Sequence, residues 1–554
     1  MRSFEELCGM DTAARQASID QTARLIEATG VELVRFAWCD LHGNLRGKTL
    51  VACAVAKAMQ AGVGMVSTLM LKDTSDRTAY KVFEASGVAD LPGFECASNL
   101  LLLADPASYR QLPWAPKTGW VQCQPWFQDG MPVALDTRRI LQAALARLAD
   151  QGLGMRCGLE VEFHIYRIHN DSRRSSRDMG YRPNVDSQLA PNAEPHRDPQ
   201  LDPGQAAWPG LPPKVSMIHP GYNLLSEAWA DMSDEPLRIV QHTAQALGLP
   251  LLSLEIELGP SQVEAVFEAT DALTAADNMV LFRSAVTQAL RRAGFHATFM
   301  CRPPFPNIMS SGWHLHQSLV QLPDSHQSLV PLDGSHQALG RLDALQKLAE
   351  PSTVKAGSTK GRNLFMRDAP APGTTPLDAQ HTLSSLGEHY LAGLLVHARG
   401  MAALATPTVN GFERYSPNAL APQSILWGRD NRGAMLRVVG QAGESATRIE
   451  NRIGEPAANP YLYIASQIHA GLDGIVRQLT APPASTAPYE EGNDKLPASL
   501  GEALDALQAD DALVQGLGRE FVGYYARIKQ QELRRFGEAE DKLDWQRREY
   551  FSRF

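Results

Sequence analysis

The sequence lacks the cysteine patterns that a disulfide framework or a structural zinc site needs. It has seven cysteines in 554 residues, an odd number, and no two of them form a CxxC pair. Scattered and unpaired cysteines are typical of proteins from a reducing compartment, so we expect a cytoplasmic location. The seven are Cys8, Cys39, Cys53, Cys96, Cys123, Cys157 and Cys301.

Long apolar runs are also missing. No window approaches the roughly 18 uncharged apolar residues of a membrane span. The most apolar long stretch, residues 390–409, contains His397 and Arg399, and it is better interpreted as a buried helix. The first residues carry charges from the second position onward, which does not match a secretory signal peptide. We therefore expect a soluble protein.

An excess of positive charge is missing as well. The chain has 52 Lys and Arg against 61 Asp and Glu, a net charge of −9, which argues against a protein whose main partner is nucleic acid or an anionic membrane. Hydrophobic residues make up 44% and charged residues 20%, as in folded globular proteins. Length alone predicts about three to four domains.

Several local patterns indicate how the chain is organised. Residues 31–51 alternate like strands on either side of an Asp-Leu-His-Gly-Asn turn, which predicts a hairpin within a β-rich N-terminal unit that ends near residue 118. Asp136 begins an amphipathic helix that stops at Gly152 and opens a larger second domain, residues 119–554. After residue 488 the helical periodicity and charged pairs indicate a helical tail.

Two segments interrupt this second domain. Residues 168–215 are rich in Ser, Arg, Asn, Asp and Pro and resemble an inserted loop. Residues 320–345 contain most of a duplicated decapeptide, HQSLVQLPDS then HQSLVPLDGS, begun a third time. Two copies are too few for a solenoid, so a local loop duplication is expected. We accordingly interpret the copied His326 and His336 as solvated rather than metal-binding.

Pairs of acidic residues lie on two predicted strands. Glu160 and Glu162 are two positions apart and therefore share one strand face. Glu257 and Glu264 flank a Gly-Pro turn across which they could face each other. Such carboxylates suit a hard divalent cation. Taken alone, however, the first pair is better explained by an acidic outer strand face, and a hairpin with surface acids explains the second pair equally well.

Histidines and arginines follow the acidic pairs. His314 and His316 share a strand face after Ser-Ser-Gly, and a series of arginines occupies residues 414–452. Guanidinium groups bind carboxylate and phosphate oxygens in fork geometry. Together, carboxylates, a histidine and arginines indicate a divalent-cation site that faces a phosphate-containing ligand, which is the equipment of phosphoryl transfer.

In order and spacing, seven motifs resemble the glutamine synthetase family over nearly the whole chain. They are E-x-E at residue 160, E-x-G-P-x-Q-x-E at 257, S-G-x-H-x-H-x-S at 311, N-x-x-x-R…AP at 410, N-R-x-x-x-x-R at 431, R-x-E-x-R at 448 and A-N-P-Y at 458. The resemblance implies an α+β fold, with an N-terminal β-grasp domain at residues 1–118 and a catalytic domain built on a curved antiparallel sheet with flanking helices. It also implies a ring-shaped homo-oligomer, a hexamer or dodecamer, with active sites between subunits.

The resemblance assigns roles to individual residues. Glu162, Glu257 and Glu264 match ligands of the metal that faces the substrate carboxylate, and Glu160, His314 and Glu450 match ligands of the metal on the ATP phosphates. His316, Ser318, Arg437 and Arg448 match ATP contacts. The glutamate site of the family is matched by Arg414, Arg452 and Ser310. Its catalytic positions are matched by Arg432, Arg452 and Glu162. The expected cofactors are ATP and two or three Mg²⁺ or Mn²⁺ ions per site.

The chain departs from the family where ammonium is bound. The glutamate expected six residues after Arg414 is Leu420, the Asp-Gly-Ser-Ser latch of the N-terminal domain is not apparent at residues 64–69, and Met309 stands near the position of an asparagine. A cation pocket without acids binds ammonium poorly. The resemblance therefore favours the γ-glutamyl–amine ligase branch, which includes γ-glutamylanilide and γ-glutamylpolyamine synthetases, with a hydrophobic or aromatic amine such as aniline.

Three alternatives remain at this stage. The enzyme could be a glutamine synthetase that uses ammonia, or a γ-glutamylpolyamine synthetase whose acids come from the insertion or from a neighbouring subunit. A non-catalytic structural relative ranks last, because all six metal-ligand positions are filled.

Overall fold

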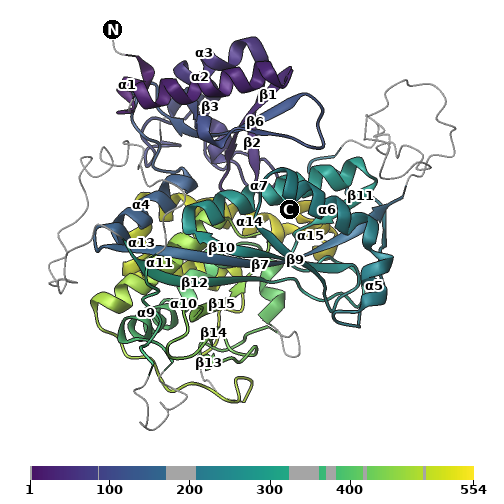
Figure 1. The fold of residues 1–554 in the computed structure, drawn as a ribbon, viewed down its shortest axis with the longest axis vertical. Helices are drawn as coiled ribbons and strands as arrows, with labels where there is room; N and C mark the ends of the chain where they lie inside the picture. Colours follow the sequence, from purple (N-terminus) through teal and green to yellow (C-terminus); the bar gives the residue numbers. More distant parts are fainter. Residues whose placement is uncertain are drawn as a thin grey trace.

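The protein consists of a small N-terminal layer seated on a larger body that contains a long central strand (Figure 1). The computed structural model describes residues 3–10, 12–84, 86–169, 207–322, 361–369, 382–415, 421–490 and 494–554. Leu420, His326 and His336 lie outside these residues, as do most of the decapeptide repeat and most of the segment after Ile168.

The N-terminal layer is a six-stranded sheet covered by helices. The order of its strands is β2-β1-β6-β4-β3, with β5 paired to β6, and β1 and β6 are parallel. The predicted hairpin is present, since β1 and β2 pair antiparallel. The elements are α1 (Phe4–Leu7), α2 (Thr12–Ala28), β1 (Leu33–Cys39), β2 (Leu45–Val51), α3 (Val55–Ala61), β3 (Val63–Val66), β4 (Asn99–Ala104), β5 (Arg110–Gln111) and β6 (Thr118–Trp126).

This N-terminal sheet extends beyond residue 118, where the sequence suggested a boundary. β6 lies between β1 and β4, and its side chains Val121 and Cys123 are buried in the core. Because β6 is a central strand, the N-terminal sheet closes only at Trp126. The composition near residue 118 marks a turn before this strand and not the end of the sheet.

The larger body is built on a nine-stranded sheet in which β7 is the long central strand. The order is β13-β14-β15-β12-β7-β10-β9, with β8 and β11 also on β7, and the pairs are antiparallel except for β13 with β14. The strands are β7 (Leu153–Ile168), β8 (Val215–Met217), β9 (Leu251–Ile256), β10 (Gln262–Asp271), β11 (Phe295–Thr298), β12 (Trp313–Gln321), β13 (Trp427–Arg429), β14 (Leu436–Val439) and β15 (Arg448–Gly454).

Strand register locates the ends of both interruptions. Ile168 at the end of β7 pairs with Val215 at the start of β8, so the segment between them leaves the sheet and returns to the same point. At the second interruption, Val320 on β12 forms a bridge with Asn363. Each long segment thus begins and ends at paired backbone, which is where a loop can lengthen without disturbing a sheet.

Helices cover one face of the central sheet. On β7 and β10, Phe163 and Phe267 contact Phe282 of α7 edge to face, and on β12 Trp313 contacts Tyr463 of α11 in the same way. The helices are α4 (Thr137–Ala149), α5 (Glu227–Met232), α6 (Asp234–Ala246), α7 (Ala272–Arg292), α9 (Ser385–Val396), α10 (Ala398–Ala405), α11 (Pro460–Val476), α12 (Leu500–Ala509), α13 (Asp511–Leu517), α14 (Arg519–Glu538) and α15 (Lys542–Tyr550).

Several helices match sequence-based expectations. Asp136 is the N-cap residue of α4, residues 390–409 contribute to the buried helices α9 and α10, and the C-terminal tail is helical from α12 to α15. Among the described residues, no helix combines the length and the hydropathy needed to cross a membrane.

Candidate active site

The predicted site residues lie in one row across the central sheet. Register places Glu264 of β10 opposite Glu162 of β7, and Glu160 of β7 opposite His314 of β12. Further along, His316 of β12 lies opposite Glu450 of β15. Glu450 in turn lies opposite Arg437 of β14. Five neighbouring strands therefore bring together residues that are up to 290 positions apart, since 450 minus 160 is 290.

Alternation along the strands explains why these side chains share a face. On β7, Glu160 and Glu162 alternate with Val161 and Phe163, and the two apolar side chains are fully buried on the helix-covered face. The polar face is consequently left for the carboxylates. Their proximity is a product of the same period-two pattern that builds the core.

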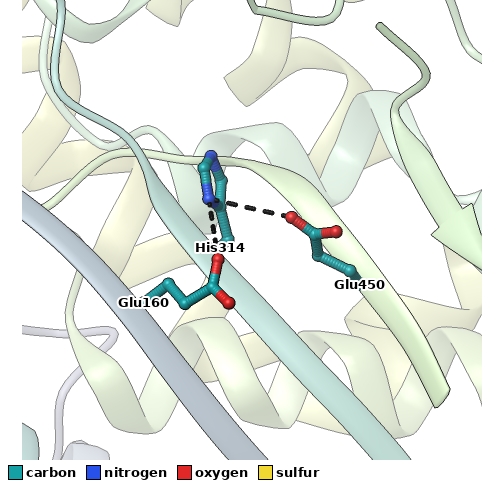
Figure 2. Close-up of side chains that lie close together, drawn as sticks. All are labelled: Glu160, His314 and Glu450. Atoms are coloured by element: carbon teal, nitrogen blue, oxygen red, sulfur yellow. Dashed lines mark ion pairs between the residues drawn. The ribbon is translucent and has the colours of Figure 1, made fainter. Parts of the chain in front are cut away.

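Two groups of side chains converge on His314. Glu160 and Glu450 form one group with His314, and Glu162 and Glu264 form the other. Figure 2 shows the first group, in which both carboxylates point toward the imidazole. Nδ1 of His314 is 3.5 Å from Oε2 of Glu160 and 3.7 Å from Oε1 of Glu450, and Nε2 is 3.8 Å from Oε1 of Glu162.

These separations are too long for hydrogen bonds, and they match ligands that share an ion. Oxygen ligands stand about 2.0–2.6 Å from Mg²⁺ or Ca²⁺, so neighbouring ligand atoms lie about 3–4 Å apart. Among the described residues, neither ring nitrogen of the buried His314 has a hydrogen-bond partner. Buried polar atoms are normally satisfied. The orphaned imidazole and the converging carboxylates thus fit a divalent cation.

Glu257 lies at the turn between β9 and β10, and its role as a metal ligand stays a prediction. It follows β9 by one residue, and its backbone N–H donates to the carbonyl of Gln262 across the Gly259-Pro260 turn. It belongs to neither group of potential ligands in the described chain, where His314 joins Glu162 and Glu264 instead. Glu257 nevertheless lies close enough to Glu162 for that charge to raise its pKa. The turn places it at the edge of the cluster.

Glu162, Glu264 and the neighbouring Glu257 repel one another. Burial, reinforced by the charge of Glu162, raises the pKa of Glu264 to about 10 and that of Glu257 to about 8. Crowded buried carboxylates of this kind retain protons unless a cation replaces them. A bound cation would therefore stabilise the ionised form of these carboxylates.

The first group behaves differently. Burial raises the pKa of Glu450, but His314, Arg452, His316 and Arg437 outweigh it and hold the pKa at about 2. Glu160 follows the same pattern, since His314 and His316 outweigh burial and lower its pKa. These two carboxylates are ionised at neutral pH and ready to bind a metal ion.

We expect Mg²⁺ to stabilise the protein more at high pH than at low pH. With raised carboxyl pKa values at Glu257 and Glu264, the folded, metal-free chain binds protons that the unfolded chain releases, so its free energy of unfolding falls as pH rises from about 4.5 towards 8–10. Mg²⁺ takes the place of those protons. Melting temperatures with EDTA and with saturating Mg²⁺, at about pH 6 and about pH 8.5, measure the effect.

The Glu264→Gln variant is the control for this prediction, because an amide keeps the size of the side chain and removes the titrating group. We expect its Mg²⁺-induced shift to be small at both pH values. An equal Mg²⁺-induced shift of the wild type at the two pH values would contradict the assignment.

The residues expected to contact ATP surround the first group. His316 accepts a hydrogen bond at Nδ1 from Nε of Arg448, 3.0 Å away, and its Nε2 lies 2.9 Å from Oε1 of Glu160. Arg437 donates from Nη1 to Oε2 of Glu450 at 2.9 Å. Ser318, half-buried, follows His316 on the same face of β12. This part of the site is an interlocked set of cations and carboxylates.

Arg432 is exposed and lies outside both groups of carboxylates. It is exposed in the turn between β13 and β14, and its charge contributes to lowering the pKa of the neighbouring Asp430, after the hydrogen bond and charge of Arg437. The structure puts Arg432 near the end of the row of site residues and does not bring it into the carboxylate groups found among the described residues.

The residues expected to bind glutamate lie beside the second group. A Cβ at Gly312 would stand only 2.4 Å from Nη2 of Arg414, so glycine allows the guanidinium to lie against the backbone. Arg414 donates from Nη1 to the carbonyl of Arg452, and Arg452 donates from Nη1 to Oε1 of Glu450. Ser310 is nearly buried two residues before Gly312.

Sequence reasoning assigned no role to Gln262, although its motif contains it. Its Nε2 donates to Oε2 of Glu162 at 2.9 Å and to the carbonyl of Ser310 at 3.3 Å. The backbone N–H of Gly312 also donates to Oε2 of Glu162, at 2.9 Å. One oxygen of Glu162 is thus fixed by two donors, which orients the other oxygen toward the cluster. The glutamine of the E-x-G-P-x-Q motif is the feature of the sequence from which this contact could have been predicted.

Comparisons with known proteins agree with this site. The catalytic domain of glutamine synthetase matches residues 134–339 and 360–550. A γ-glutamylanilide synthase from an Acinetobacter species is 32% identical over 98% of this chain and 97% of its own. A γ-glutamylethanolamide synthetase from Streptomyces coelicolor is 26% identical, with 97% and 96% covered. The solved structure of GmaS with ADP superposes with a TM-score of 0.66 at 25% identity, covering 95% of this chain and 98% of that one.

The family match spans more than half of the chain, and it includes every strand that carries a predicted metal ligand. The curated relatives match over nearly their full lengths, and the superposition covers both sheets. The protein therefore belongs to the glutamine synthetase family and is a ligase of that family.

Proposed function

We propose that this enzyme joins the γ-carboxylate of glutamate to an organic amine, with ATP converted to ADP and phosphate. The observation that carries the proposal is the match to a γ-glutamylanilide synthase along both whole chains, combined with the two groups of carboxylates around His314. We further propose that the amine is aromatic or small and hydrophobic, as aniline is.

The proposed reaction has two steps. A γ-carboxylate oxygen of glutamate attacks the γ-phosphorus of ATP, the bond to the β-phosphate oxygen breaks, and ADP leaves. The amine nitrogen then attacks the carbonyl carbon of the resulting γ-glutamyl phosphate, phosphate leaves, and the nitrogen loses a proton to give the amide. Splitting the reaction in this way replaces the poor hydroxide leaving group with phosphate.

The chain's own residues would supply binding and charge neutralisation. Two or three Mg²⁺ or Mn²⁺ ions, held by the two carboxylate groups and His314, would offset the charge of the phosphates and the substrate carboxylate. Arg452 and Arg414 would orient the glutamate and the transferred phosphoryl group, and Arg437 and Arg448 the nucleotide. Such pre-positioned cations account for most catalysis in phosphoryl transfer.

The proposed choice of amine rests on an apolar residue six positions after Arg414. Leu420, which lies outside the described residues, stands where the resemblance implies an ammonium-binding glutamate. An apolar surface disfavours a desolvated ammonium ion but accepts an amine that enters uncharged. Aromatic amines are neutral at physiological pH. A ring-shaped oligomer with sites between subunits belongs to the same proposal.

A panel of amines tests the function. We expect the purified protein, given ATP, Mg²⁺ and glutamate, to release phosphate fastest with aniline or a small alkylamine and slowest with ammonium. Putrescine, ethanolamine and methylamine complete the panel, and mass spectrometry of the γ-glutamyl amide identifies the product. The Leu420→Glu variant should shift the preference toward ammonium while keeping phosphate release.

Other outcomes would favour the alternatives. Ammonium-dependent release that exceeds release with every organic amine would make the protein a glutamine synthetase, and a preference for putrescine would make it a polyamine ligase. Equal loss with all amines in Leu420→Glu would contradict the pocket argument. Absence of phosphate release with every amine would overturn the ligation proposal.

A further inference from the structure

Arg302 and Glu413 form a pair of opposite charges at one end of the row of site residues. Nε of Arg302 lies 3.8 Å from Oε2 of Glu413, and the two side chains are 35% and 41% exposed. Nη1 of Arg302 also donates to Oγ of Ser310, 3.2 Å away. None of the catalytic roles described above uses Arg302 or Glu413.

The buried side-chain amides of Asn410 and Gln546 form hydrogen bonds with Arg302 and Glu413. Asn410 accepts from the backbone N–H of Arg302 at 2.8 Å and donates to its carbonyl at 2.9 Å, and it also donates to Oε1 of Gln546 at 2.7 Å. Gln546 donates from Nε2 to Oε1 of Glu413 at 2.9 Å. Asn410 and Gln546 are almost fully buried. The half-exposed charged ends are therefore held on a rigid base.

The pair lies next to the carboxylates of the second group. Ser310, which receives the hydrogen bond from Arg302, is joined to Glu162 by the single side-chain amide of Gln262. On the other side, Glu413 precedes Arg414, whose guanidinium lies against Gly312. Arg302 is thus linked to Glu162 through Ser310 and the side-chain amide of Gln262.

We propose that Arg302 binds the α-carboxylate of glutamate and that Glu413 binds its α-ammonium, with Ser310 at the carboxylate. This inference rests on the proposed function and names the residues that recognise the amino-acid end of its substrate. An α-amino acid carries an ammonium and a carboxylate group on the same carbon, and Glu413 and Arg302 offer the complementary negative and positive charges. A half-exposed pair 3.8 Å apart contributes little to folding, so its charges can be used for a ligand.

The sequence just before Ser310 departs from the family pattern. Met309 stands where an asparagine of the family was expected to contact the α-groups of glutamate, and an apolar side chain offers them no hydrogen bond. Arg302 and Glu413 would supply these contacts from the segment after β11 and from the loop after α10.

Glutamate analogues separate this role from a structural one. Glutarate lacks the α-amino group, and 4-aminobutyrate lacks the α-carboxylate. We expect Arg302→Gln to raise KM for glutamate about 10- to 100-fold with little change in kcat, as for loss of a charge-assisted hydrogen bond. The inhibition constant of 4-aminobutyrate against glutamate should stay the same. Glu413→Gln should likewise raise KM for glutamate and leave inhibition by glutarate unchanged.

Arg238→Gln is the matched control, because Arg238 forms a surface ion pair with Asp234 on α6, away from the site. It should leave all constants unchanged. An unchanged KM for glutamate in Arg302→Gln, or equal weakening of glutamate and 4-aminobutyrate, would overturn the inference while leaving the proposed function intact. A wild-type protein that releases no phosphate with any amine would overturn both.

Discussion

We expect the Glu162→Ala variant to release no measurable phosphate with any amine. Glu162 is the carboxylate on which the second group depends, because it lies opposite Glu264 and its charge raises the pKa of both Glu264 and Glu257. Without it the site loses a potential metal ligand and a fixed oxygen beside the substrate carboxylate. Loss of a metal ligand removes the charge neutralisation on which phosphoryl transfer depends, so the effect should reach at least about 10³-fold in kcat/KM.

Folding should survive this change. The substitution leaves the N–H of Gly312 without its acceptor, which costs about 1–3 kcal/mol, whereas the amide of Gln262 keeps the Ser310 carbonyl and Oγ of Ser311 as acceptors. Relief of repulsion among the remaining carboxylates offsets part of that cost. A circular dichroism melt checks stability, and Glu268→Ala, an exposed glutamate on β10, serves as control. Retained phosphate release in Glu162→Ala would remove this residue from the reaction.

The second large effect is expected for Arg452→Lys. Arg452 is nearly buried, and it donates from Nη1 to Glu450. Its Nε is buried and has no hydrogen-bond partner among the described residues. Lysine keeps the positive charge beside Glu450 but cannot reproduce the planar fork of guanidinium. We expect kcat to fall about 10²- to 10³-fold, as for loss of one transition-state donor.

Two measurements separate this effect from misfolding and from weaker nucleotide binding. KM for ATP and the melting temperature should stay close to the wild-type values, because the buried charge pair is preserved. Arg167→Lys is the matched control, because Arg167 lies on β7 and forms a surface ion pair with Glu235 of α6. This variant should behave like the wild type. A large rise in KM for ATP with unchanged kcat would instead place Arg452 in nucleotide binding.

Local patterns were sufficient to predict many elements. The hairpin of residues 31–51, the helix that begins after Asp136 and the helical tail each depend on neighbouring residues, so periodicity and turn chemistry specify them. The boundary at residue 118 and the estimate of three to four domains were less successful. β6 joins a sheet whose other strands lie earlier in the chain, so the N-terminal sheet includes residues after 118.

For the site, the sequence identified residue types but not all partnerships. The sequence sets of metal ligands, in which Glu257 joins Glu162 and Glu264, stay a prediction, and in the structure the side chain of His314 lies near the ligand atoms of both groups. The Arg302–Glu413 pair depends on contacts of Arg302 with Asn410 and of Glu413 with Gln546, each between residues more than 100 positions apart. Local sequence patterns do not show which distant segments will pair, so these contacts could not be predicted from the sequence.

The sequence by itself determined which residues could carry charge and which face of each strand they occupy. The proportions of hydrophobic and charged residues indicate a globular protein, and period-two alternation put Glu160 and Glu162 on one side of β7. Only the tertiary structure decided which strands are neighbours, because backbone hydrogen bonds between distant segments set the register. That register joins five strands into one site and leaves His314 between both groups of carboxylates.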